Sequence, residues 1–79
     1  MLALSDVISA QGVGIGTAVP NASAQLDVSS TTKGFAPPRM TTGQRDAISS
    51  PTEGLIIYNL TTHKLNIYTG SAWEMITSI

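Results

Sequence analysis

Alternating apolar and polar residues are clearest in the last third of the chain. Three short runs, at 55–59, 64–68 and 73–77, are rich in β-branched, aromatic and other apolar residues. The segments between them, 60–63 and 69–72, carry threonine, serine or glycine. Short runs of this kind, separated by turn residues, are typical of strands joined by tight hairpins. The pattern predicts a three-stranded antiparallel meander.

One short helix is predicted just before these strands. Thr41 and Gln44 have the spacing of a capping box, in which the threonine hydroxyl accepts a backbone N–H and the glutamine reaches back. The helix is expected to run to about Ile48, with Ala47 and Ile48 facing inward. Arg45 and Asp46 are expected on its exposed or interfacial side. A helix of barely two turns holds only through contacts with the rest of the fold.

Upstream of the helix, the sequence predicts an extended arm. Glycine alternates with β-branched residues at 12–17, which indicates a strand that another backbone approaches closely. A second short strand is expected at 24–28. Because both are too short to pair usefully within one chain, residues 1–33 are predicted to form an N-terminal arm or stalk and residues 34–79 a C-terminal domain.

The segment at 35–40 is expected to be extended, because each proline of Pro37-Pro38 biases the preceding residue away from helix. Phe35 and Met40, at its two ends, are the predicted apolar anchors that pin it onto a core. The fold class is therefore mainly β: a small meander with one short helix and an extended N-terminal arm.

Both faces of the predicted meander are apolar. A sheet with one solvated face alternates apolar with polar residues, yet the face predicted to point outward still carries four large side chains: Ile56, Tyr58, Tyr68 and Ile76. Tyr58 and Tyr68 are expected to lie opposite one another across a strand pair. The short helix or the Pro-Pro segment can cover one face. Another copy of the same chain is the expected cover for the other.

The size and composition of the chain also predict self-association. A chain of 79 residues is small enough to need a disulfide, a metal or oligomerisation for secure folding. Cysteine is absent, and one histidine with five acidic residues makes a metal a poor candidate, so oligomerisation remains. A net charge of -1 argues against a nucleic-acid partner, and no run approaches the ~20 apolar residues of a membrane span.

The first eleven residues have small side chains before Gln11, as signal-peptidase sites do. They lack a basic region, however, and Asp6 interrupts a short apolar run. We expect a remnant of a longer parent's upstream segment, or a peptide that orders on assembly, rather than a complete signal peptide.

The sequence offers no arrangement suited to catalysis. Asp27, Asp46 and Glu53 fall in different elements, so no carboxylate pair is predicted. His63 is expected to be a solvated loop residue; the alternative is a metal on a three-fold axis, where each chain would supply one ligand. The glycine-rich segment lacks the Lys-Ser/Thr of a phosphate-binding loop. We expect no catalytic, cofactor or metal site and no enzymatic activity.

An ordered series of short motifs resembles a recurring module of phage tail-fibre and related bacterial surface proteins. The match runs from about Gly12 to Trp73, and its elements are Val13-Gly14-Ile15-Gly16-Thr17 with Pro20, Leu26-Asp27-Val28, Thr32-Lys33-Gly34-Phe35 with Pro37-Pro38-Arg39-Met40-Thr41, Gln44-Arg45-Asp46-Ala47-Ile48, Gly54-Leu55-Ile56-Ile57-Tyr58-Asn59, Lys64-Leu65, Tyr68 and Gly70-Ser71-Ala72-Trp73. In outline, the later part is also similar to the C-terminal trimerisation domain of phage fibritin.

The resemblance implies a homotrimer around a three-fold axis, an upstream fibre shaft in a longer parent, and no catalytic residues. It places the protein in a virion or, equally, on the surface of a bacterium or outside it. The physical argument alone predicts self-association and does not distinguish a trimer from another oligomer.

The predicted interface consists of the large apolar and aromatic side chains of the C-terminal domain, with Trp73 as its principal anchor: Phe35, Met40, Ile48, Leu55, Ile57, Tyr58, Leu65, Ile67, Tyr68, Trp73, Met75 and Ile76. Arg39 and Arg45 are candidates for pairing with Asp46 or Glu53 across subunits, which would set register. The alternative function is a receptor- or glycan-binding fibre tip, in which Tyr58, Tyr68 or Trp73 is exposed for a host-surface glycan.

Overall fold

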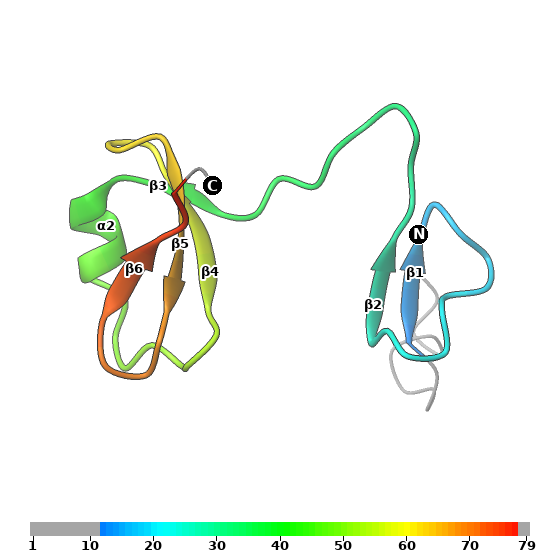
Figure 1. The fold of residues 1–79 in the computed structure, drawn as a ribbon, viewed down its shortest axis with the longest axis horizontal. Helices are drawn as coiled ribbons and strands as arrows, with labels where there is room; N and C mark the ends of the chain where they lie inside the picture. The colour runs from blue at the N-terminus through cyan, green and yellow to red at the C-terminus, as the bar shows by residue number, and fades with distance from the viewer. Residues whose placement is uncertain (1–11, 78–79) are drawn as a thin grey trace. The chain divides into compact units, whose positions relative to one another are not determined.

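The computed structural model describes residues 12–77, which form parts of two compact units (Figure 1). The units comprise residues 1–35 and 36–79, so the division falls two residues beyond the predicted boundary. Each unit is described separately. The expectations for residues 1–11 lie outside the described part of the chain.

The N-terminal unit is a two-stranded parallel sheet. Strand β1 (Val13–Ile15) pairs with β2 (Leu26–Val28), with Val13 beside Leu26 and Ile15 beside Val28. The prediction that these strands are too short to pair within one chain is therefore wrong. The loop between them is held by Asn21, whose N–H donates to the Asp27 carboxylate at 2.8 Å.

Two glycines explain why such short strands can pair. A Cβ at Gly12 would meet the carbonyl oxygen of Ala24, and one at Gly16 would meet that of Ser29. Gly16 also has a φ of 79°, which favours glycine. The close approach of a second backbone, predicted from the alternating glycines, is confirmed. The backbone that approaches belongs to the chain itself.

The C-terminal unit is built on a four-stranded sheet in the order β3-β4-β5-β6. Its strands are β3 (Arg39–Met40), β4 (Ile56–Asn59), β5 (Lys64–Tyr68) and β6 (Trp73–Met75). The β4, β5 and β6 strands form the predicted antiparallel meander. The predicted count of three is corrected to four, because the end of the Pro-Pro segment forms β3.

Strand β3 runs parallel to β4 at one edge of the sheet, with Arg39 beside Tyr58 and Met40 beside Asn59. The Tyr58 N–H donates to the Pro38 carbonyl at 2.8 Å, and the Leu60 N–H to that of Met40 at 2.7 Å. Met40 is half-buried, as expected of an anchor. Phe35 is 66% exposed, so it does not pack on a core within the chain, and its place in an interface stays a prediction.

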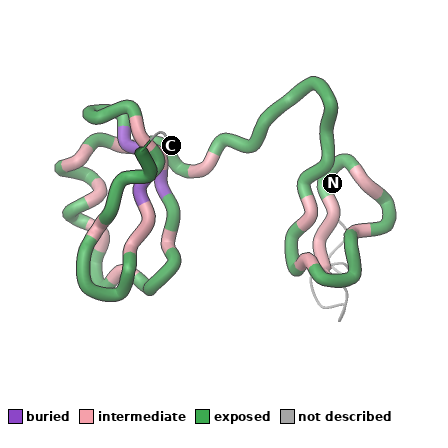
Figure 2. Tube along the Cα trace, in the orientation of Figure 1, coloured by how far each residue is buried: buried purple, intermediate pink, exposed green. Residues whose placement is uncertain are grey.

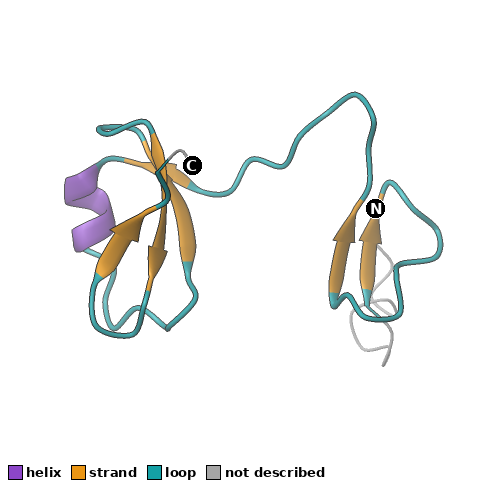
Figure 3. Ribbon diagram, viewed as in Figure 1, coloured by secondary structure: helices purple, strands orange, loops and turns teal. Residues whose placement is uncertain are grey.

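Helix α2 (Thr42–Asp46) starts at the predicted capping box. The Thr41 hydroxyl accepts the Gln44 N–H at 3.2 Å, and the Gln44 side chain accepts the Thr41 N–H at 2.9 Å. The helix ends at Asp46, with Ala47 as its C-cap, and so is shorter than predicted. It lies against one face of the sheet (Figure 3).

Among the described residues of the C-terminal unit, four in the turns have a positive φ, and two of them are glycines. Gly54 and Gly70 have φ values of 89° and 98°, which suit glycine. His63, at the end of the β4–β5 turn, has a φ of 59°, and Ser50 has one of 48°. These left-handed conformations are uncommon for residues with a Cβ.

The strand register assigns each side chain to a face. Tyr58 pairs with Leu65, and Tyr68 pairs with Trp73. The prediction that the two tyrosines oppose one another is therefore wrong. The predicted composition of the outward face also changes, because Leu65 and Ile67, rather than Tyr68, lie on the same face as Tyr58.

The core lies between α2 and the sheet, and it is small and partly polar (Figure 2). Ile57 is 2% exposed, whereas Asn59 and Asn66 are fully buried. Among residues 12–77, no helix is long and apolar enough to cross a bilayer.

Candidate association faces and their polar support

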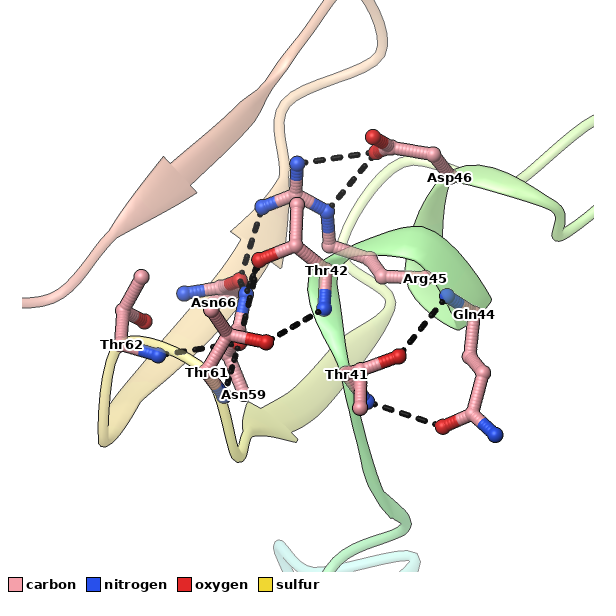
Figure 4. Close-up of polar contacts among 9 residues, drawn as sticks. All are labelled: Thr41, Thr42, Gln44, Arg45, Asp46, Asn59, Thr61, Thr62 and Asn66. Carbon is pink, nitrogen blue, oxygen red and sulfur yellow. Dashed lines mark hydrogen bonds and ion pairs between the residues drawn. The ribbon is translucent and has the colours of Figure 1, made fainter.

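The face of the sheet beneath α2 contains a polar cluster, which we define as Thr42, Arg45, Asn59 and Asn66 (Figure 4). Asn59 is central to it. Its Nδ2 donates to the Thr42 hydroxyl and to the Asn66 Oδ1, both at 2.9 Å. Its Oδ1 accepts the N–H groups of Thr61 and Thr62 at 2.8 and 3.2 Å. One side chain thus joins the helix, two strands and the β4–β5 turn.

Arg45 closes the cluster from the helix side. Its Nη1 donates to the Asn66 Oδ1 at 2.9 Å, while Nη2 and Nε donate to the Asp46 carboxylate at 2.9 and 3.1 Å. The guanidinium carbon lies 5.5 Å from the ring centre of Trp73, within the range of a cation–π contact. Tyr68 packs edge-to-face on the same ring, with centroids 5.3 Å apart.

These contacts correct part of the predicted orientation of the helix. Asp46 is exposed and Ile48 is half-buried, as expected. Arg45, however, was expected on the exposed or interfacial side, yet its side chain is only 16% exposed and points at the sheet. Ala47, the other predicted inward residue, is exposed. Arg45 pairs with Asp46 of its own chain at 2.9 Å, and its pairing across subunits stays a prediction. The long Arg45 side chain reaches the polar cluster, and its guanidinium donates to both Asn66 and Asp46.

Every buried side-chain nitrogen and oxygen in the described residues has a hydrogen-bond partner. Buried amides without partners would each cost about 1–3 kcal/mol, so the cluster is stable because it is complete. The consequence is a rigid scaffold: the helix, the sheet and one turn are fixed by directional bonds rather than by a large apolar core.

The other face of the sheet is apolar and uncovered. We call it the open face and define it as Ile56, Tyr58, Leu65, Ile67 and Ile76. The register places the first four on one side of the sheet, opposite Ile57 and Asn66; Ile76 follows β6 and its N–H donates to the Leu65 carbonyl. Ile56, Leu65 and Ile76 are 44, 37 and 49% exposed. A contiguous apolar patch of this kind marks an interaction surface.

The N-terminal unit has a smaller apolar face of the same type. Val13, Ile15, Leu26 and Val28 share one side of the β1–β2 pair, because partners in a parallel register lie on the same face. Ile15, Leu26 and Val28 are 57, 52 and 40% exposed. A two-stranded sheet is marginal by itself, so this unit also depends on further contacts.

The predicted interface residues are distributed over both faces of the C-terminal sheet and the segment before it. Tyr58, Leu65, Ile67 and Ile76 lie on the open face, and Ile57 is buried within the chain itself. Tyr68 and Trp73 pack together on the helix side, half-buried, while Met75 is 51% exposed. Met40, Ile48 and Leu55 are half-buried and Phe35 is exposed. Their role in an interface stays a prediction.

Sequence reasoning left three important residues off this list. Ile56 belongs to the open face, and its position two residues from Tyr58 was a usable signal. No role was predicted for Asn59 and Asn66, although they are the most buried polar side chains in the described residues. Only the three-dimensional position of Thr42 and Arg45 explains why these amides lie inside.

The structure of residues 12–77 contains no group of three histidine, cysteine or acidic side chains close enough to hold a metal. His63 is exposed in the β4–β5 turn, where its N–H donates to the Asn59 carbonyl at 2.8 Å. The two apolar faces are suited to contacts with protein.

A small β unit with one sheet face covered by a helix, and the other face apolar and open, defines a module built to associate. The chain belongs to the family of phage tail-like trimerisation regions, whose model matches residues 14–79. The match includes both units. No curated protein and no solved structure matches the chain.

Proposed function

We propose that this chain is a non-enzymatic trimerisation module of a phage tail fibre or a related fibrous surface protein. Three copies bury their open faces against one another around a three-fold axis and thereby fix the register of the chains in the fibre. The observation that carries the proposal is that the open face is apolar and exposed to solvent. The opposite face of the sheet is covered by the helix, and its buried polar groups all have hydrogen-bond partners. Membership of a trimerisation family supports three as the number of copies.

The two faces of the sheet differ in a way that supports this function. The polar cluster holds the sheet in one shape before association, so little conformational freedom remains to be lost when copies meet. The open face then contributes the driving force, at about 25 cal/mol per Å² of apolar surface removed from water. A rigid scaffold with an apolar contact surface suits permanent assembly better than turnover of a substrate.

The test is the solution mass of the full chain by light scattering behind a sizing column, over a hundredfold dilution. We expect three chains at high concentration and a loss of mass on dilution that is much greater for Leu65→Lys. Leu65 is 37% exposed on the open face, and a lysine there would place a charge in the buried contact.

Leu60→Lys is the matched control. Leu60 is similarly exposed, at 45%, but it lies in the β4–β5 turn, beyond the last residue of β4. Its substitution is expected to leave the mass unchanged. A monomeric wild-type chain at micromolar concentration, or equal effects of the two lysines, would reject the proposal.

The alternative function, a receptor- or glycan-binding fibre tip, has less support. Sugar-stacking sites need an accessible aromatic face, whereas Trp73 already contacts Arg45 and Tyr68. Tyr58 lies on the open face, which trimerisation would cover. Glycan-array binding by the trimer, lost in Tyr58→Ala, would favour this alternative.

A further inference from the structure

Two opposite charges lie at opposite edges of the open face. Arg39 is in edge strand β3, on the same side of the sheet as Tyr58, its register partner. Glu74 is in edge strand β6, on the same side as Ile67. Both side chains are exposed, and within residues 12–77 neither one forms an ion pair or a side-chain hydrogen bond. They are the charged residues that the sheet register places on this face.

Three copies related by a rotation axis meet through unlike surfaces. In a cyclic trimer, each contact joins one side of a copy to the other side of its neighbour. When the open faces surround the axis with their strands running along it, the β3 edge of one copy meets the β6 edge of the next. This brings a positively charged edge next to a negatively charged one at each of the three contacts.

We propose that Arg39 of one copy pairs with Glu74 of the next copy, and that this pair selects the cyclic arrangement of the trimer. The inference rests on the proposed function, because it requires the open faces to meet. The occupant of the open face is thus a second copy of this chain, oriented by charge complementarity. The apolar side chains supply the affinity, while the charges at the rim exclude other orientations.

Charge reversal tests the pair in the full chain. Arg39→Glu and Glu74→Arg each place like charges at all three contacts, and the concentration at half-dissociation is expected to rise about tenfold, given the modest strength of exposed pairs. The double variant, Arg39→Glu with Glu74→Arg, restores opposite charges with the sense reversed. We expect its midpoint to return to within about threefold of the wild type.

Mixing the two single variants gives an independent readout. Each single variant repels itself, whereas a mixed trimer has two attractive contacts and one repulsive contact. Mass measurement of the mixture is therefore expected to show trimers at concentrations where either variant alone has dissociated. In 1 M salt, where the screening length is about 3 Å, the differences among the variants should shrink.

Lys33→Glu is the matched control for Arg39→Glu. It changes the net charge equally at an exposed position outside the open face, and it is expected to leave the midpoint unchanged. If the single reversals have no effect, or if the double variant dissociates as readily as they do, the pair is rejected while a trimeric wild type still supports the proposed function. A wild-type chain that is monomeric at all concentrations would reject both.

Discussion

The buried amide of Asn59 provides the strongest test of how this unit is stabilised. Replacement by alanine removes its hydrogen bonds to four residues: the side chains of Thr42 and Asn66, and the turn N–H groups of Thr61 and Thr62. The two side-chain bonds lie inside the fold and contribute about 1 kcal/mol each. The two turn N–H groups belong to exposed residues and can bond to water instead, so their loss costs about 0.5 kcal/mol each.

The expected loss is therefore about 3 kcal/mol of unfolding free energy. A domain of this size has only about 0.05–0.15 kcal/mol per residue of net stability, so the loss is a large part of the total. With a urea dependence of about 1–3 kcal/mol per M, the unfolding midpoint should fall by about 1–3 M. Trp73, which packs against the cluster through Arg45, is the fluorescence probe, at a fixed protein concentration.

Thr69→Ala is the matched control within the same unit. Its hydroxyl makes three hydrogen bonds, with Ser71 and Ala72, all of them in an exposed turn. The expected loss is below about 1 kcal/mol, because water replaces the lost partners. If Asn59→Ala costs no more than Thr69→Ala, burial does not give the amide its importance and the argument for the polar cluster fails.

Three further substitutions test local features. Thr41→Ala removes the capping box and should lower the free energy of unfolding in urea by about 1 kcal/mol. Thr52→Ala, at an exposed position that caps no helix, should lower it little. Equal losses would contradict the capping role. His63→Gly should raise stability by up to about 1 kcal/mol, because its φ of 59° suits glycine, and Thr62→Gly should not; a less stable His63→Gly variant would show that the imidazole itself matters. Gly16→Ala should abolish amide-exchange protection in β1 and β2, because its Cβ would collide with the Ser29 carbonyl. Gly34→Ala, with open space around it, should leave this protection intact. Retained protection in Gly16→Ala would show that the loop can move away.

Local interactions were the predictable part of this fold. The capping box, the glycine turns and the strand at 64–68 depend on residues close in sequence, and their positions followed from residue type alone. The alternating glycines also indicated a close backbone approach. Which backbone would approach was not predictable, because a partner loop in the same chain and one in another copy satisfy the same steric requirement.

Non-local pairing accounts for most of what was missed. Strand β3 adds to the sheet beside β4, and nothing in two residues after a pair of prolines specifies that partner. The face assignment, by contrast, had a usable signal. The loop at 60–63 makes Asn59 and Lys64 partners, and counting back from that pair puts Leu65, rather than Tyr68, across from Tyr58.

The buried amides were missed because burial of a polar side chain depends on partners supplied by other elements. Asn66 lies inside because Arg45 and Asn59 both donate to its oxygen. In a sequence, such an asparagine is indistinguishable from one that faces solvent. The inward direction of Arg45 was missed for the same reason, because it depends on an acceptor in another element, the Asn66 side chain.

The entry of the chain into the C-terminal unit through β3 has a mechanical consequence. Because β3 runs parallel to β4, tension applied through the upstream chain acts along β3 and across the two bonds that join Tyr58 to Pro38 and Leu60 to Met40. Both bonds are then loaded in shear and must break together. A hairpin entry would instead be unzipped one bond at a time. In a stretched fibre, the unit would therefore be held at a point that resists pulling.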